Sequence, residues 1–213
     1  MKNSSISRKD KLKSKKQAPA NYLIVCEGKK TEPSYFRGLK KKINEKYGNK
    51  VDVLIPDIEV KGTGMNTTSI VKYTEKKVNQ STKVYGQVWV VFDKDDYNDE
   101  QFDLAIKNCE YNVAWSNPSF ELWLLAHFKK ISRYISKDNV LKELTKEFQR
   151  KGLGAYAKND TNIFHKVTSD GKLNVAIKNC KYMEDLNAGG KDSQRNPMTK
   201  VYKLVYGLME YLE

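Results

Sequence analysis

Short apolar runs alternate with amphipathic segments through the first half of the chain. Four of the runs are predicted strands, over residues 22–26, 51–60, 87–92 and 111–115. The third is almost wholly apolar, which is typical of a strand buried on both faces of a sheet. Amphipathic helices are predicted between the strands, over residues 31–48, 67–78 and 99–109, with Thr31 as a candidate cap. Strands separated by helices of this length predict a mostly parallel α/β sheet flanked by helices.

The pattern becomes helical from Pro118 onward. Helices are predicted over residues 120–128, 140–148, 173–186 and 201–212, and the polar residues 187–197 predict an exposed loop. We therefore expect one domain over residues 20–213, with an α/β portion at about 20–128 and a helical portion at about 129–213. His127 is expected to pack on the mostly buried helix at 120–128, and His165 to lie in a surface loop.

The charge of the chain favours a polyanionic partner. Lysine and arginine number 39 against 26 acidic residues, which gives a net charge of +13. Residues 1–19 carry a disproportionate share of this charge and few apolar side chains, so they are predicted to be a disordered basic leader. The net charge is therefore weaker evidence about what the folded residues bind, although nucleic acid remains the expected partner.

Targeting and redox signals are weak. The chain has no apolar run of about 18 residues and no apolar core of a secretory signal, so we expect a cytoplasmic protein that does not enter a membrane. Its three cysteines, Cys26, Cys109 and Cys180, fit neither a disulfide framework nor a paired zinc site. They are expected to be reduced packing residues.

Carboxylates follow two of the predicted strands. Glu27 ends the first strand, and Asp93 and Asp95 end the third. Because the carboxyl ends of parallel strands meet at one edge of a sheet, these acids can come together there. Strand alternation places Asp93 and Asp95 on the same side, whereas Asp96 points elsewhere. Carboxylates of this kind select Mg²⁺ or Mn²⁺, although a polar turn is the alternative explanation for the aspartates.

Other charged residues could complete such a site. Glu32 and Glu121 each fall at the start of a predicted helix, where a carboxylate could simply favour the helix dipole or cap the helix. Asn117 is a candidate cap for the helix that contains Glu121. Lys29, Lys30 and Lys61 could bind phosphate oxygens. The chain has no Gly-Lys-Ser/Thr phosphate loop, which disfavours a nucleoside triphosphatase.

Four segments together resemble the RloB-like family, in order and over about residues 21–208. They are Cys26-Glu27-Gly28-Lys29-Lys30-Thr31-Glu32-Pro33, Phe92-Asp93-Lys94-Asp95-Asp96, Asn117-Pro118-Ser119-Phe120-Glu121-Leu122-Trp123-Leu124-Leu125 and Asn196-Pro197-Met198-Thr199-Lys200-Val201. That family is similar to Toprim domains, the metal-binding fold of topoisomerases, primases and OLD-family nucleases. It occurs among phage-defence genes, including abortive-infection systems.

The resemblance implies roles for matching residues. Glu27 would be a metal ligand or general acid/base, and Asp93 and Asp95 would be metal ligands. By similarity to OLD-type nucleases, Glu32, Ser119 with Glu121, and Lys158 would complete the catalytic set. The candidate nucleic-acid contacts are Lys29, Lys30, Lys61, Lys94 and Ser119.

A metal-dependent nuclease acting on DNA or RNA in antiphage defence is therefore the leading hypothesis. It would use Mg²⁺ or Mn²⁺ and could act with an ATPase encoded in the same operon, because such ATPases accompany members of the family. Two alternatives stay open: a nucleic-acid-binding or partner-binding module without catalysis, and a Toprim-type nucleotidyl transferase. No strand-passage domain or zinc ribbon is apparent, which disfavours a topoisomerase.

Overall fold

A computed structural model of the chain describes residues 22–47, 53–54, 67–169 and 172–212. The predicted basic leader at 1–19 and the candidate phosphate ligand Lys61 lie outside the described residues. So does most of the apolar run at 51–60, of which only the part at Val53–Leu54 is described, as a strand.

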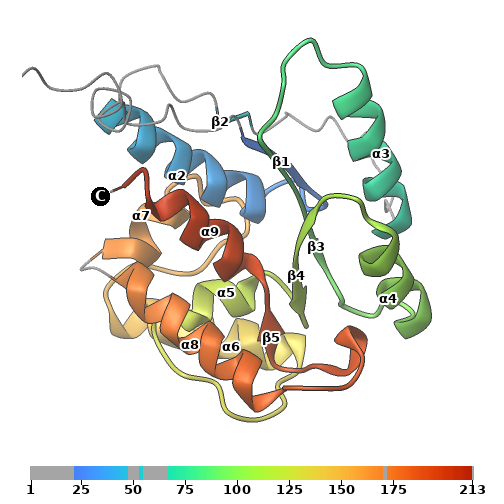
Figure 1. Cartoon of the computed structure of the whole chain (residues 1–213). Helices are drawn as coiled ribbons and strands as arrows, with labels where there is room; N and C mark the ends of the chain where they lie inside the picture. The colour runs from blue at the N-terminus through green and yellow to red at the C-terminus, as the bar shows by residue number, and fades with distance from the viewer. Residues whose placement is uncertain (1–21, 48–52, 55–66, 170–171, 213) are drawn as a thin grey trace, which may run out of the picture.

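A five-stranded sheet organises the molecule, in the spatial order β2-β1-β3-β4-β5 (Figure 1). The first four strands are parallel, and β5 pairs antiparallel with β4. The α/β class and the mostly parallel sheet are confirmed. The pattern predicted only helices after Pro118, and the short β5 is an addition. The strands are β1 (Tyr22–Cys26), β2 (Val53–Leu54), β3 (Gln87–Asp93), β4 (Asn112–Asn117) and β5 (Met198–Thr199).

Three helices connect the parallel strands: α2 (Thr31–Tyr47), α3 (Thr67–Asn79) and α4 (Asp99–Asn108). In Figure 1, α3 and α4 lie on one side of the sheet, and α2 lies on the other with the C-terminal helices. The two faces are therefore both covered, which is why β1 is buried at every residue.

The C-terminal part comprises α5 (Glu121–Ala126), α6 (Lys137–Arg150), α7 (Ile163–Thr168), α8 (Lys172–Leu186) and α9 (Val201–Met209). All six residues of α5 are buried, as the apolar run at 122–126 suggests, and they include the charged residue Glu121. The helix α7 was not predicted, because six residues are too few to show a helical period. His165 is exposed as expected, but it lies on α7 and not in a loop.

His127 packs in the core, as predicted. Its side chain is only 1% exposed, and its ring lies against Trp123 at a centroid distance of 4.7 Å. Its Nδ1 lies 2.9 Å from the carbonyl oxygen of Trp123. Burial lowers the pKa of His127 to about 4, so the imidazole is neutral at physiological pH.

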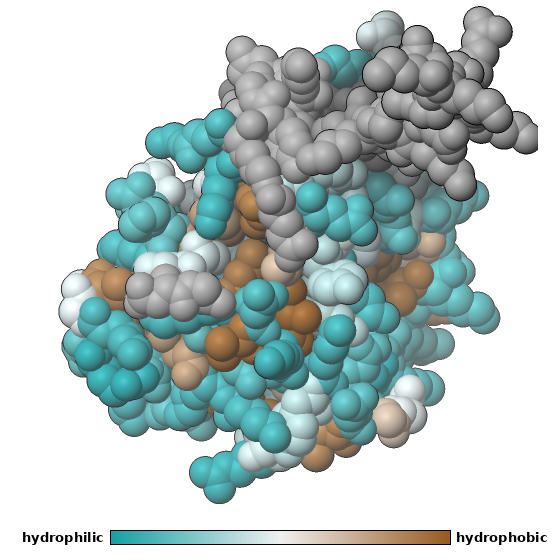
Figure 2. Space-filling model, turned by 60° about the vertical axis from the view of Figure 1, so that its left-hand side comes forward, coloured by the Kyte–Doolittle hydropathy of each residue, from teal (hydrophilic) through white to brown (hydrophobic). Residues whose placement is uncertain are grey.

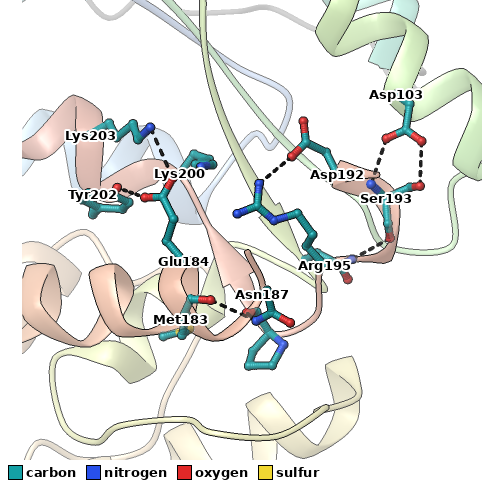
Figure 3. Close-up of polar contacts among 12 residues, drawn as sticks. Asp103, Met183, Glu184, Asn187, Asp192, Ser193, Arg195, Lys200, Tyr202 and Lys203 are labelled. Carbon is teal, nitrogen blue, oxygen red and sulfur yellow. Dashed lines mark hydrogen bonds and ion pairs between the residues drawn. The ribbon is translucent and has the colours of Figure 1, made fainter. Parts of the chain in front are cut away.

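The predicted exposed loop at 187–197 is partly wrong. Residues 188–191 are exposed, but a short 3₁₀ helix at Asp192–Gln194 follows, and Ser193 is buried. Asp103 of α4 holds Ser193 in place. The two carboxylate oxygens of Asp103 accept from the Ser193 backbone N–H at 2.9 Å and from the Ser193 hydroxyl at 2.8 Å (Figure 3). Ser193, one of the polar residues that predicted a loop, thus finds its hydrogen-bond partner on α4 inside the fold.

A second polar cluster in Figure 3 joins α8 to the start of α9. Glu184 accepts hydrogen bonds from Lys200 and Tyr202, and Lys203 lies 3.4 Å from the same carboxylate. Partial burial opposes the charge of Glu184, but its bonds to Lys200 and Tyr202 lower its pKa to about 2. This carboxylate is therefore ionised and structural.

The surface and the cysteines fit the composition. Figure 2 shows a face that is largely hydrophilic, with one apolar area near its centre and smaller ones toward its edges. Among the described residues, no helix combines the length and apolar character needed to span a bilayer. Cys26, Cys109 and Cys180 are free thiols, and two of them are fully buried, as expected of packing residues.

Candidate active site at the carboxyl edge of the sheet

The chain leaves β1 toward β2 on one side and leaves β3 toward β4 on the other, so the strand order reverses between β1 and β3. In open α/β sheets, ligands bind in the crevice that such a reversal creates. Glu27 and Asp93 meet there. The Glu27 N–H extends the pairing by donating to the Val91 carbonyl at 2.8 Å, and the Glu27 Oε2 accepts from the Asp93 N–H at 3.2 Å.

The segment after β4 adds a third carboxylate to this edge. It runs beside the end of β3, since the Asp95 N–H donates to the Pro118 carbonyl at 2.9 Å. Glu121 follows at the start of α5 and is only 4% exposed. Its carboxylate accepts from the Ser119 hydroxyl at 2.7 Å and from the Tyr156 hydroxyl at 2.8 Å. Two hydroxyl donors therefore fix both of its oxygens.

Glu32, in the first turn of α2, is the fourth carboxylate and is 8% exposed. It lies directly over Gly28: a Cβ at that position would be 2.1 Å from the Glu32 Oε2. Only glycine leaves room for this carboxylate. Glu32 also accepts from its own backbone N–H, so the helix-start alternative is realised alongside its place in the cleft.

Thr31 is the first residue of α2 and not the cap residue before it, contrary to the prediction. The Thr31 hydroxyl donates to the Lys158 carbonyl at 3.0 Å. It thereby ties the start of α2 to a segment 127 residues away. The same contact brings Lys158 to the site, where its Nζ lies 3.9 Å from the Glu121 Oε1. The sequence-predicted lysine is thus placed beside the carboxylates.

Two hollows open over these side chains. One, of about 390 Å³, is lined by Glu27, Gly28, Glu32, Asp93, Lys94, Asp95, Asp96 and Tyr97. The other, of about 260 Å³, is lined by Gly28, Lys29, Lys30, Thr31, Glu32, Asp93, Glu121, Lys137 and Lys158. Because they share Gly28, Glu32 and Asp93, the two hollows form one cleft with carboxylates at its floor and lysines on one side.

The carboxylates resist ionisation in this cleft. Burial, reinforced by Glu32 and Glu121, raises the pKa of Asp93 well above its usual range. Burial and the charges of Glu121 and Glu27 raise the pKa of Glu32 to about 7. Burial also raises the pKa of Glu27. In addition, the Asp93 Oδ1 is buried and has no hydrogen-bond partner in the described residues. Lys137 and Lys158 lower the pKa values of Glu27 and Glu32 and so offset this effect only in part.

Asp95 departs from the predicted ligand pair. The strand ends at Asp93, and Asp95 has a backbone φ of 37°, so strand alternation no longer governs where its side chain points. Its carboxylate forms an ion pair with Lys137 of α6. Partial burial works against the charge of Lys137, but Asp95 raises the pKa of this lysine. Asp95 lines the cleft with Asp93, but it is engaged by this lysine.

Two of the predicted nucleic-acid contacts, Lys94 and Ser119, are buried and already engaged within the protein. Lys94 is 8% exposed, donates to the Tyr97 carbonyl and lies 2.9 Å from Asp99, so its charge is used within the turn. Ser119 is 1% exposed and spends its hydroxyl on Glu121. Lys29 and Lys30 are exposed at the cleft, as a phosphate contact requires.

Asn117 does not cap α5 either. Its side-chain N–H donates to the Ser193 carbonyl at 2.9 Å, and its Oδ1 accepts from Asn196 at 3.2 Å. The two Asn-Pro segments, which are distant in sequence, therefore lie side by side. Both Asn-Pro peptide bonds are cis.

Lys137 and Tyr156 were missed by the sequence analysis. Lys137 contacts a residue 42 positions away, and Tyr156 one 35 positions away. Neither carries a local motif, and a lysine at a helix start looks like any other surface lysine. The only available signal was that Tyr156 stands two residues before Lys158.

The donor chemistry of the cleft fits a hard divalent cation. Carboxylate oxygens are the ligands that Mg²⁺ and Mn²⁺ select, and the unpartnered Asp93 Oδ1 lies among them. In the described residues, no three carboxylate, histidine or cysteine side chains converge on one point as a finished metal cage. The Asp95 contact with Lys137 is one physical reason, because it holds a candidate ligand on another partner.

Fold and cleft together define an α/β protein with a carboxylate-floored crevice at the reversal point of a parallel sheet. A family model for the RloB-like protein family matches residues 22–208, so the chain belongs to that family. Neither the curated proteins nor the solved structures contain a match to the chain.

Proposed function

We propose that this protein is a metal-dependent nuclease that cleaves phosphodiester bonds in DNA or RNA and acts in antiphage defence. The cleft supports the chemistry, and membership of the RloB-like family supports the biological role through the defence genes among which that family occurs. The proposal retains the Toprim-like assignment and a cytoplasmic site of action. An ATPase partner stays a prediction of the family resemblance.

The observation that carries the proposal is the environment of Asp93. Its Oδ1 is buried without a partner, at a point where the charges of Glu32 and Glu121 add to the burial that raises its pKa. A carboxyl group in such a place destabilises the fold when ionised, so a structural role does not explain it. A function in which Asp93 must serve as a negatively charged ligand of a metal ion explains it well.

The residues of the chain divide the work. Glu27 and Asp93 would hold Mg²⁺ or Mn²⁺, with Asp95 available once it leaves Lys137. When bound, the cation would activate water and neutralise the charge of the scissile phosphate. Lys29 and Lys30 are exposed at the cleft and would bind non-bridging or flanking phosphate oxygens. Tyr156 and Ser119 orient Glu121 by donating to its two oxygens.

Glu32 is suited to proton transfer. Its pKa of about 7 lets the carboxyl hold a proton at an Oε atom or release it near neutral pH. Gly28 allows the carboxylate to stay in the cleft, and Lys158 partly offsets its burial by lowering the pKa. We assign Glu32 the role of general acid or base for the leaving or attacking oxygen.

The test is cleavage of labelled DNA and RNA by purified Asp93→Asn protein with Mg²⁺ or Mn²⁺. The amide keeps the shape of the side chain and removes its charge, so cleavage should be lost while the circular dichroism spectrum and melting cooperativity persist. Asp185→Asn, at an exposed position on α8, is the matched control and should cleave like the wild type.

Equal cleavage by Asp93→Asn and wild-type protein would refute the proposed site. Salt-sensitive binding of nucleic acid without turnover under any metal condition would favour a binding module instead, because phosphate contacts alone provide such binding.

A further inference from the structure

An exposed aromatic ring stands on the segment that joins α5 to α6. Tyr134 is 75% exposed, although large apolar or aromatic side chains usually cover at least part of their surface in a fold. The surrounding stretch, residues 129–137, contains Lys129, Lys130, Arg133 and Lys137 and no acidic residue. The ring is therefore flanked on both sides by positive charge.

The fold fixes this segment even though residues 129–136 form no helix or strand. Asn196 brackets Ile135 by accepting from its N–H at 3.0 Å and donating to its carbonyl at 3.1 Å. Ile131 is buried, and Lys129 forms an ion pair with Glu143 of α6 at 2.6 Å. A backbone held at several points presents Tyr134 at little further cost in conformational entropy when a ligand binds.

The segment has room for a ligand beside the ring. A hollow of about 480 Å³ is lined by Lys129, Lys130, Ile131, Ser132, Arg133, Tyr134, Ile135, Asn139 and Glu143. Lys130 has its Nζ 3.3 Å from the ring centroid of Tyr182, a contact that holds this ammonium group in place on the surface. Arg133 is exposed next to Tyr134.

The segment also leads to the carboxylate cleft. Lys137 is three residues beyond Tyr134, a span of at most about 11 Å for an extended chain. Lys137 lines the cleft and forms the ion pair with Asp95. A ligand lying along this segment would therefore arrive at the cleft with its charged groups already facing lysine and arginine.

We propose that residues 129–137 form a track for single-stranded nucleic acid, in which a base stacks on Tyr134 and the adjacent phosphates contact Lys130, Arg133 and Lys137. This inference rests on the proposed nuclease function and names the substrate class of that site. Bases in a duplex already stack on each other, so an exposed ring on a loop can stack only on an unpaired base. Ring and cations together are the combination that binds single strands with little sequence preference.

The test measures binding of short labelled single strands of DNA and of RNA to the full chain, with EDTA present so that no cleavage occurs. Tyr134→Ala should weaken binding about 5- to 100-fold, and Tyr134→Trp should retain it, because stacking requires only an aromatic face. Binding of a duplex of the same sequence should be unaffected by Tyr134→Ala. Tyr206→Ala is the matched control, since Tyr206 is also exposed, at 58%, but lies on α9.

Single-strand binding by Tyr134→Ala at the wild-type level would overturn the inference, and so would an equal loss in the Tyr206→Ala control. If Tyr134→Ala leaves all nucleic-acid binding intact but prevents association with a protein, the segment is a protein-docking surface and the inference is wrong.

The outcomes separate this inference from the nuclease proposal. Asp93→Asn should lose cleavage and keep Tyr134-dependent single-strand binding, whereas Tyr134→Ala should raise KM and leave kcat at saturating substrate near the wild-type value. Tyr134-dependent binding in a protein that never cleaves would support the track and refute the nuclease. Cleavage by a protein whose binding does not depend on Tyr134 would support the nuclease proposal and refute the track.

Discussion

Asn196 donates a hydrogen bond from its side chain to the Oδ1 of Asn117, 79 residues earlier in the chain, at 3.2 Å. The same amide group of Asn196 also brackets the backbone of Ile135. One side chain therefore connects the segment that enters the carboxylate site from β4 with the segment that presents Tyr134. Both segments depend on a residue that lines neither the carboxylate cleft nor the hollow beside Tyr134.

Asn196→Ala should lower the free energy of unfolding by roughly 1–3 kcal/mol, because it leaves the N–H and carbonyl of Ile135 without these partners. Urea unfolding monitored by circular dichroism measures the change. Asn174→Ala is the control, since Asn174 is exposed on α8 and should change stability by no more than about 0.5 kcal/mol. Equal stability of the two variants would contradict the assigned role of Asn196.

Gly28→Ala should impair cleavage without unfolding the protein. The new Cβ would lie 2.1 Å from the Glu32 Oε2, so the carboxylate must leave its place in the cleft. Misplacing a catalytic group by about 1 Å can reduce the rate on the order of 100-fold, which single-turnover cleavage would detect. Gly207→Ala is the control, because its nearest contact is an ordinary 3.5 Å to the Tyr22 hydroxyl. Full activity of Gly28→Ala would show that Glu32 need not occupy this position.

Glu32→Gln should stabilise the protein at alkaline pH. The carboxyl has a pKa of about 7 in the fold and an ordinary value of 4.5, so the folded state retains a proton that the unfolded state releases. Wild-type stability therefore falls as pH rises from about 4.5 to 7, and the variant escapes this loss of up to about 3 kcal/mol.

Urea unfolding at acidic and alkaline pH measures this difference. Below about pH 4.5 the wild type and Glu32→Gln should be nearly equal, since both side chains are then neutral. Glu45→Gln, at an exposed position of the same helix, should show no comparable gain at alkaline pH. A gain that is the same at every pH would indicate a packing effect and not the removal of a buried charge.

Lys137→Met should free Asp95 as a ligand and move the onset of metal binding to higher pH. Asp95 raises the pKa of Glu27 and Lys137 lowers it, so loss of the lysine raises the pKa of Glu27 further. Protons then compete with the cation up to a higher pH. The measurement is the rise in melting temperature caused by Mg²⁺, recorded as a function of pH.

Lys146→Met is the control for that experiment. Lys146 lies on the same helix and pairs with Glu143 at the surface, far in sequence from Asp95. Its replacement should leave the pH profile of metal stabilisation unchanged. Identical profiles for the two lysine variants would show that the Lys137 contact does not control the carboxylates.

Local pattern was sufficient for the elements that carry the site. The apolar runs that become β1, β3 and β4 are visible along the chain, and a strand that ends in a carboxylate must deliver it to the edge of the sheet. Glu27 and Asp93 were found for that reason. Pattern failed for α7 and for β5, which are too short to show a period and form because the rest of the fold packs against them.

What the sequence by itself determined is therefore the α/β class, the positions of the main strands and the acids placed at their ends, because these follow from hydrophobic periodicity within a few residues. Only the tertiary structure decided which charged and polar side chains remain available to bind a metal ion or a phosphate. It consumed Lys94 and Ser119 in local bonds, turned Asp95 toward Lys137, and brought Tyr156 and Lys158 to Glu121. The contacts of Asp95, Tyr156 and Lys158 join segments tens of residues apart. Those of Lys94 and Ser119 are local, but they depend on the burial of these side chains in the fold. Neither distant proximity nor burial of this kind has a local signature in the sequence.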